Sequence, residues 1–119
     1  MATNYVQAGE VIDYTAGADI SSGDVVAVGN LVGVAITDIA SGDTGAVSVE
    51  GVWELPKVSA AVIGAGETVN YDVSASAFDD NAATAATGDL TGGCVAVAAA
   101  GNGDLTVLVK INVGANAVT

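Results

Sequence analysis

The residues Leu105-Thr106-Val107-Leu108-Val109-Lys110-Ile111-Asn112 alternate apolar side chains with mostly polar ones. A period of two places the odd-numbered row on one face of a β-strand and the even-numbered row on the other. Similar alternation recurs from Val69 to Val73 and from Ala46 to Glu50, and Gly-Asp pairs lie between many of the runs. Glycine and aspartate favour turns, because positive φ angles and bonds from side chain to backbone cost them little. Short strands at this spacing predict an all-β fold, a single small β-sandwich or β-barrel.

The composition agrees with this fold class. Hydrophobic residues are 51% of the 119-residue chain, and valine far outnumbers leucine. β-Branched side chains suit a pleated sheet and lose rotamer freedom in a helix. The length predicts one β domain over residues 1–119, with enough surface to bury for one small core.

One stretch, from Ala75 to Thr87, breaks the strand pattern. Asp79, Asp80 or Asn81 could cap one short helix near residues 80–87. An exposed loop is the equal alternative for this stretch, and the core does not depend on which of the two forms.

The charge balance excludes several classes of partner and reaction. The chain has 14 acidic and 2 basic residues, no histidine, and a net charge of −12. Gripping nucleic acid or an anionic membrane surface requires clustered cations, so neither partner is expected. Without histidine there is no Ser-His-Asp or Cys-His catalysis and no His-ligated metal. The single cysteine, Cys94, cannot form an intrachain disulfide, and neither a signal peptide nor a membrane span is evident. We therefore expect a soluble protein made in the cytosol.

The many carboxylates do not assemble into a recognisable site. Catalysis by a carboxylate pair needs two groups in one cleft with their pKa values pushed apart, whereas these acids mostly follow glycine in turns. Asp72, Asp79, Asp80 and Asn81 are oxygen ligands of the kind calcium prefers, but the spaced calcium-loop motif is missing. No enzyme, catalytic residue, metal ligand, cofactor or small-molecule substrate is predicted. An extracellular or surface β-module, with or without calcium, stays an alternative.

Aromatic residues are the candidates for contacts with a partner. Residues 1–15 are polar and include Tyr5 and Tyr14, so this segment is either an extended N-terminal arm reaching a neighbour or the first strand of the sheet. Trp53 is either a core filler or an interface anchor. The interface residues predicted are Tyr5, Val6, Gln7, Tyr14 and Trp53.

Taken together, the first half of the chain resembles a family of small tailed-phage proteins, the capsid cement or decoration proteins. The likeness is good over residues 1–57 and weaker near residues 66–71 and 107–110, and the stretch from Ala75 to Thr87 does not match. The stretches that carry it are Asn4-Tyr5-Val6-Gln7, Val11-Ile12-Asp13-Tyr14, Ser22-Gly23-Asp24-Val25-Val26, Leu31-Val32-Gly33-Val34-Ala35, Ile39-Ala40-Ser41-Gly42-Asp43-Thr44-Gly45 and Val49-Glu50-Gly51-Val52-Trp53-Glu54-Leu55-Pro56-Lys57.

The resemblance implies a function without catalysis. Such proteins are all-β modules that sit as homotrimers on the outside of the virion shell, bind the major capsid protein and hold the expanded shell together. A different virion component, such as a tail-tube or head-completion protein, is the second alternative.

Overall fold

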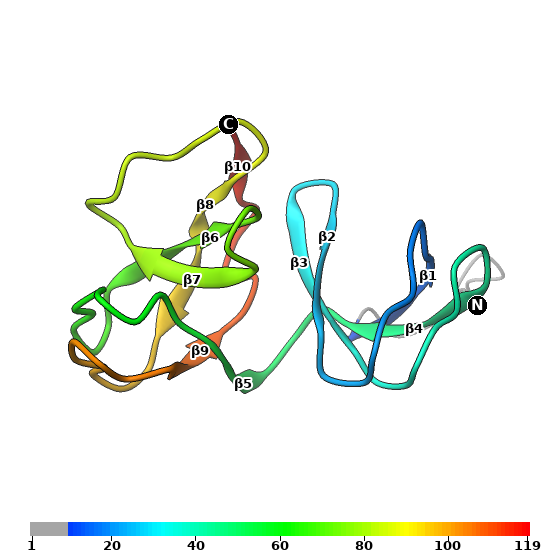
Figure 1. Ribbon diagram of the computed structural model, residues 1–119, viewed down its shortest axis with the longest axis horizontal. Helices are drawn as coiled ribbons and strands as arrows, with labels where there is room; N and C mark the ends of the chain where they lie inside the picture. The colour runs from blue at the N-terminus through cyan, green and yellow to red at the C-terminus, as the bar shows by residue number, and fades with distance from the viewer. Residues whose placement is uncertain (1–9) are drawn as a thin grey trace, which may run out of the picture.

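The computed structural model describes residues 10–119 as two antiparallel β-sheets, with no helix in that range. The molecule measures 48 × 34 × 24 Å along its principal axes, and the two sheets lie side by side (Figure 1). Among the described residues no helix is long and apolar enough to cross a membrane. The strands are β1 (Val11–Thr15), β2 (Val25–Val28), β3 (Leu31–Ala35), β4 (Thr44–Ser48), β5 (Val52–Pro56), β6 (Thr68–Asp72), β7 (Ala77–Asp80), β8 (Leu90–Ala96), β9 (Thr106–Lys110) and β10 (Ala117–Val118).

The small sheet has the strand order β1-β4-β3-β2. β1 pairs with β4 along its whole length, from Val11 opposite Ser48 to Thr15 opposite Thr44. β2 and β3 form a hairpin whose turn includes Gly29, at a φ of 59° that glycine adopts without strain. A core of small side chains lies against this sheet, made of Ala16, Val26, Ala35, Ile39 and Val47.

The large sheet has the order β5-β9-β8-β6-β7, and β10 pairs with β8. Its strand β9 confirms the predicted alternation, with Val107 and Val109 buried and Thr106, Leu108 and Lys110 exposed. The buried row contributes to the main core, whose largest fully buried side chains are Phe78, Leu55, Ile63 and Leu90.

The two edges of the large sheet approach each other at one point. A single parallel bridge joins Lys57, just after β5, to Phe78 in β7. One bridge does not close a barrel, so the structure confirms the all-β class and, of the two predicted architectures, fits a sandwich. Pro56 ends β5, as the missing N–H of proline favours.

The hairpin of β2 and β3 joins the two sheets because both of its faces are buried. Val32 and Val34 point into the core of the large sheet, with Val25 packed against it. Val26 and Ala35 point the other way, into the core of the small sheet. The hairpin therefore belongs to both cores at once.

Two asparagines from the C-terminal segment reinforce this junction. The amide of Asn112 donates to the carbonyls of Val32 and Val49 at 2.7 and 2.8 Å, and its oxygen accepts the N–H of Val32 at 2.9 Å. The Asn116 oxygen accepts the N–H of Gly93 in β8 at 2.9 Å, and its amide donates to the Asn30 carbonyl at 3.1 Å. The segment that follows β9 thus ties the start of β3 to the large sheet.

Of the two alternatives for the stretch from Ala75 to Thr87, the short helix near residues 80–87 is wrong and the exposed loop is confirmed after residue 80, where residues 81–87 are irregular and mostly exposed. Residues 77–80 form β7, and a turn follows in which Ala83 N–H donates to the Asp80 carbonyl. β7 forms because the Phe78 ring is fully buried against Tyr71, with ring centroids 5.1 Å apart. Residues 81–87 bury no side chain fully, so no packing compensates for a helix that would be too short to be stable in water.

The predicted N-terminal arm falls only partly within the described range. Residues 11–15 form β1 in the small sheet of the domain itself. Residues 1–9, with Tyr5, Val6 and Gln7, lie outside the described residues, so the arm stays a prediction for that segment.

Candidate interaction surfaces

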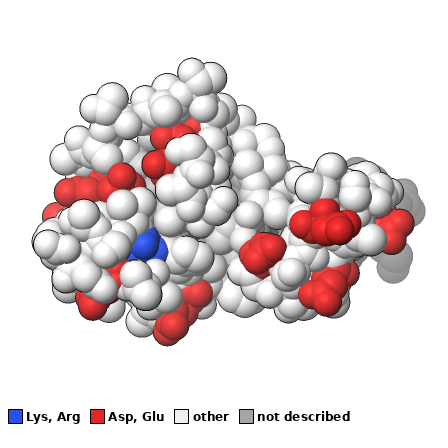
Figure 2. All heavy atoms as spheres, viewed as in Figure 1, with Lys and Arg blue, Asp and Glu red and all other residues white. Residues whose placement is uncertain are grey.

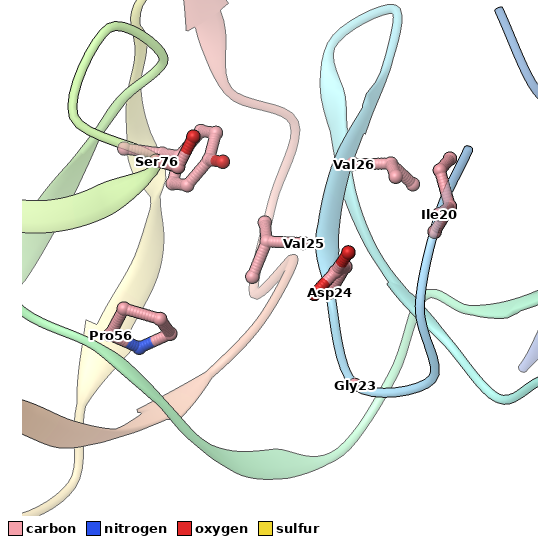
Figure 3. Close-up of a pocket in the computed structure, with 8 residues that line it drawn as sticks. Ile20, Gly23, Asp24, Val25, Val26, Pro56 and Ser76 are labelled. Atoms are coloured by element: carbon pink, nitrogen blue, oxygen red, sulfur yellow. The ribbon is translucent and has the colours of Figure 1, made fainter. Parts of the chain in front are cut away.

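A pocket of about 300 Å³ opens between the two sheets. Figure 3 shows Asp24 and Val25 on the side of the small sheet, with Pro56 and Ser76 across the gap. Tyr71 of β6 completes the lining on the side of the large sheet. The lining thus combines apolar surface with one carboxylate, one phenol and one serine hydroxyl.

The electrostatics of this pocket favour hydrogen bonding over catalysis. Burial raises the pKa of the Tyr71 phenol, a hydrogen bond with Ser76 opposes this rise, and the carboxylates of Asp24 and Asp72 add to it. The phenol is therefore neutral at physiological pH and cannot act as a base there.

Many of the carboxylates hold turns of the chain in place. Asp89 accepts the N–H groups of Val73 and Ala86 at 3.1 and 2.9 Å. The hydroxyl of Ser74 donates to Asp72 Oδ1 at 2.6 Å, and this bond is the main reason that the pKa of Asp72 is lowered. The acidic side chains that accept backbone N–H groups are Asp19, Asp24, Asp38, Glu67, Asp72, Asp79, Asp80, Asp89 and Asp104.

The described residues do not assemble a metal centre. In the range 10–119, no group of three or more His, Cys, Asp or Glu side chains is placed to hold an ion. Of the residues considered as calcium ligands, Asp79 accepts the N–H of Asp80, and Asp80 accepts the N–H of Ala82. Both carboxylates therefore accept hydrogen bonds from the backbone of the turn in which they lie.

The two lysines have different environments. Lys57 is buried, and its ammonium donates to the carbonyls of Val58, Ser59 and Ala61 at 2.7, 3.1 and 2.6 Å. Lys110 is exposed on β9. Acidic side chains are spread over both sheets on the face that Figure 2 shows, with little basic surface among them. Within residues 10–119 the surface is therefore strongly acidic, and Lys110 is its one exposed basic side chain.

The outward surface of β5, β9 and the end of β8 is apolar for a solvent-exposed sheet. Val52, Leu108 and Val97 are 53%, 40% and 44% exposed. We call this surface the outer face of β5–β9–β8; it consists of Val52, Glu54, Leu108 and Lys110, together with Val95 of β8 and Val97 just after β8. Sequence reasoning did not single it out, although Leu108, an apolar residue in an otherwise polar row, was the available signal.

The predicted interface residues within the described range lie on different sheets. Tyr14 is half-buried on β1, where it packs against the core of the small sheet. Trp53 is half-buried on β5, packs against the main core, and donates from Nε1 to the Glu50 carbonyl at 3.0 Å. Both rings combine core packing with partial exposure, and their role at an interface stays a prediction.

Comparison with known families gives one finding. The model of a family described as phage cement protein matches residues 6–111. The matched range includes β1 to β9, and therefore the core strands of both sheets. No curated protein matches the chain.

Proposed function

The chain belongs to the phage cement protein family, and on this basis we propose that it is a head decoration protein that binds the outside of the mature capsid lattice and stabilises it. The family indicates a structural component of the phage capsid rather than an enzyme. The proposed partner is the major capsid protein, the proposed state is a homotrimer, and the protein is made in the host cytoplasm. The observation that carries the proposal is the family match across both sheets.

The mechanism we propose is linkage between binding and lattice state. A protein that binds the expanded lattice and not the unexpanded one stabilises the expanded form by its binding free energy. Repetition over many sites lets modest contacts reinforce the whole shell, and three linked copies raise the effective concentration of each contact.

The charge of the chain supports a place outside the shell. With a net charge of −12 and one of its two lysines buried, the surface repels packaged DNA. The same charge steers the protein toward basic patches on a capsid surface.

Five residues are proposed to contact the capsid or a neighbouring subunit. Tyr5, Val6 and Gln7 precede β1, Tyr14 lies on it, and Trp53 lies on β5. Tyrosine and tryptophan are favoured in interfaces because each combines a large apolar ring with a polar atom.

Co-sedimentation with capsids tests the function. The purified protein is mixed with unexpanded and with expanded shells of its own phage, both prepared without it. The expected result is saturable binding to expanded shells alone and a higher temperature of shell disruption. Equal binding to both forms, or to neither, would refute stabilisation of the mature lattice.

A truncation tests the proposed arm. Deleting residues 2–9 leaves β1 and its pairing with β4 in place, so the fold is expected to survive. The occupancy of expanded shells should fall in this variant. Circular dichroism should show that the shortened chain is folded, and unchanged occupancy after the N-terminal deletion would dismiss the arm.

A further inference from the structure

The outer face of β5–β9–β8 is open, whereas another part of the same side of the large sheet is covered. On β6, Asn70 is buried and its amide donates to the carbonyls of Asp80 and Ala83, so the segment after β7 lies over that part of the sheet. On β5, β9 and the end of β8, no such cover is present among the described residues, and Val52, Leu108 and Val97 remain about half exposed. Exposed apolar side chains that are contiguous on a sheet mark an interaction surface.

The strand register sets the pattern on this surface. In one row across the strands, Val52 lies opposite Lys110, and Lys110 lies opposite Val95. In the next row, Glu54 lies opposite Leu108, and Val97 N–H donates to the Leu108 carbonyl. The four side chains on β5 and β9 stand at the corners of a rectangle, with apolar residues on one diagonal and opposite charges on the other.

This arrangement of four side chains is complementary to itself when a two-fold axis relates two copies of the chain. When two copies face each other across an axis that runs along the apolar diagonal, Val52 meets Val52 of the second copy and Leu108 meets Leu108. The same operation places Lys110 of each copy opposite Glu54 of the other. Isologous interfaces require this property, that residue i contacts j while j contacts i.

The charge of the chain favours a second copy as the occupant. Lys57 is buried, so Lys110 is the only basic side chain of the chain that is left for the surface, and it is placed where an acidic partner can reach it. Two copies that each carry −12 repel each other over most of their surface. On the outer face, however, two Lys–Glu pairs replace this repulsion by attraction, and three apolar side chains per copy leave water.

From the register and the charges we propose that the outer face of β5–β9–β8 binds the same face of a second copy of this chain about a two-fold axis, with Lys110 of each copy paired to Glu54 of the other. This contact does not depend on capsid binding. It also differs from a three-fold contact, which joins two different surfaces. If the free protein is a trimer, the two-fold contact joins trimers to each other.

Analytical ultracentrifugation of three charge variants tests the proposal. The expected wild-type species contains two copies, or a multiple of three copies that is six or larger if the protein also forms trimers, and it dissociates on dilution. Glu54→Lys places two lysine pairs across the axis and Lys110→Glu places two glutamate pairs there, so each should weaken the two-fold contact by about tenfold or more. The double variant, Glu54→Lys with Lys110→Glu, restores opposite charges and should restore the association.

A second pair of variants separates apolar burial from general effects. Leu108→Glu should abolish the two-fold contact, whereas Ile36→Glu, at a residue 43% exposed after β3, should leave it unchanged. Circular dichroism confirms that each variant is folded.

The outcomes that overturn the proposal are distinct from failure of the capsid function. A species of one or three copies at all concentrations overturns it, as does association that ignores the single charge changes or is not rescued by the double one. Loss of capsid binding in Leu108→Glu, with no self-association in the wild type, would assign the face to the capsid protein instead.

Discussion

The two sheets of this protein bury unequal amounts of apolar surface. The small sheet is packed with Ala16, Val26, Ala35, Ile39 and Val47. The large sheet is packed around Phe78, Leu55, Ile63 and Leu90, each no more than 1% exposed. Stabilisation by burial grows with apolar area, so the small sheet has less of its own. It gains the rest through the hairpin of β2 and β3, whose second face lies in the core of the large sheet. A small sheet can thus be stable when one of its hairpins also packs into the core of a neighbouring sheet.

The largest expected effect is the loss of a ring from the large sheet. Phe78→Ala removes a fully buried side chain that also stacks on Tyr71, and should lower the free energy of unfolding by about 3–5 kcal/mol. Because the hairpin depends on this core, both sheets should lose protection together. Urea denaturation measures the loss, and hydrogen exchange shows where it occurs.

The matched change in the small sheet is Val47→Ala, at a residue that is also fully buried. It removes two methyl groups and should lower the free energy of unfolding by about 2 kcal/mol, with the loss of protection largely within the small sheet. The proposed difference between the sheets would be refuted if Val47→Ala lowered hydrogen-exchange protection in the large sheet as much as Phe78→Ala does.

A buried lysine gives the next largest expected effect, again in the large sheet. Lys57→Met removes the ammonium that donates to three backbone carbonyls, and should cost about 2 kcal/mol because those carbonyls lose their partner. The exposed Lys110→Met is the control and should change the free energy of unfolding by no more than about 0.5 kcal/mol. Thermal unfolding that is equal in the two variants would show that the three bonds contribute nothing.

Much of this fold could be predicted from local pattern, and the exceptions share one cause. Alternation between 105 and 112 predicted β9 because one side of that strand is buried and the other faces solvent. β7 was missed because its decisive contact, Phe78 on Tyr71, is made across strands and leaves no periodic signal in so short a run. After β7, residues 81–87 form the exposed loop that was one of the two alternatives for them.

The surfaces were harder to predict than the strands. Trp53 and Tyr14 were chosen for their chemistry, and the structure shows both half-buried against separate cores. Lys110 and Glu54 lie diagonally across β9 and β5 because of the register between these two strands. Neither strand's sequence alone predicts that register. The burial of Lys57 likewise depends on carbonyls that a loop presents only after folding.

The link between the sheets can be weakened without touching either core. Asn112 has a φ of 54°, which asparagine and glycine tolerate, so Asn112→Gly removes the side chain without straining the backbone. Loss of its bonds to Val32 and Val49 should cost about 1–2 kcal/mol. Hydrogen exchange should rise in β3 and less in β8. Asn112→Ala, which also strains the backbone, should lower the free energy of unfolding further than Asn112→Gly does. If Asn112→Gly changed the exchange rates of β3 and β8 equally, Asn112 would not be a specific link between the two sheets.

The smallest effect is a pH dependence that belongs to the large sheet. The hydrogen bond from the Ser74 hydroxyl is the main cause that lowers the pKa of Asp72, at the end of β6, below its value in an unfolded chain. Because the pKa is lower in the folded state, the unfolded state binds the proton more tightly. The stabilisation from Asp72 is therefore fully present above the unfolded pKa, about 3.9, and is lost as the pH falls through the folded pKa. Since Asp72 is well solvated, the contribution should be about 0.5 kcal/mol or less.

Asp72→Asn should therefore flatten the acid limb of the stability curve slightly. Asp13→Asn, on the exposed face of β1, removes the same charge from the small sheet and controls for net charge. An acid limb that is equally steep in Asp72→Asn and the wild type would show that this turn adds no pH-dependent stability to the sheet that carries most of the core.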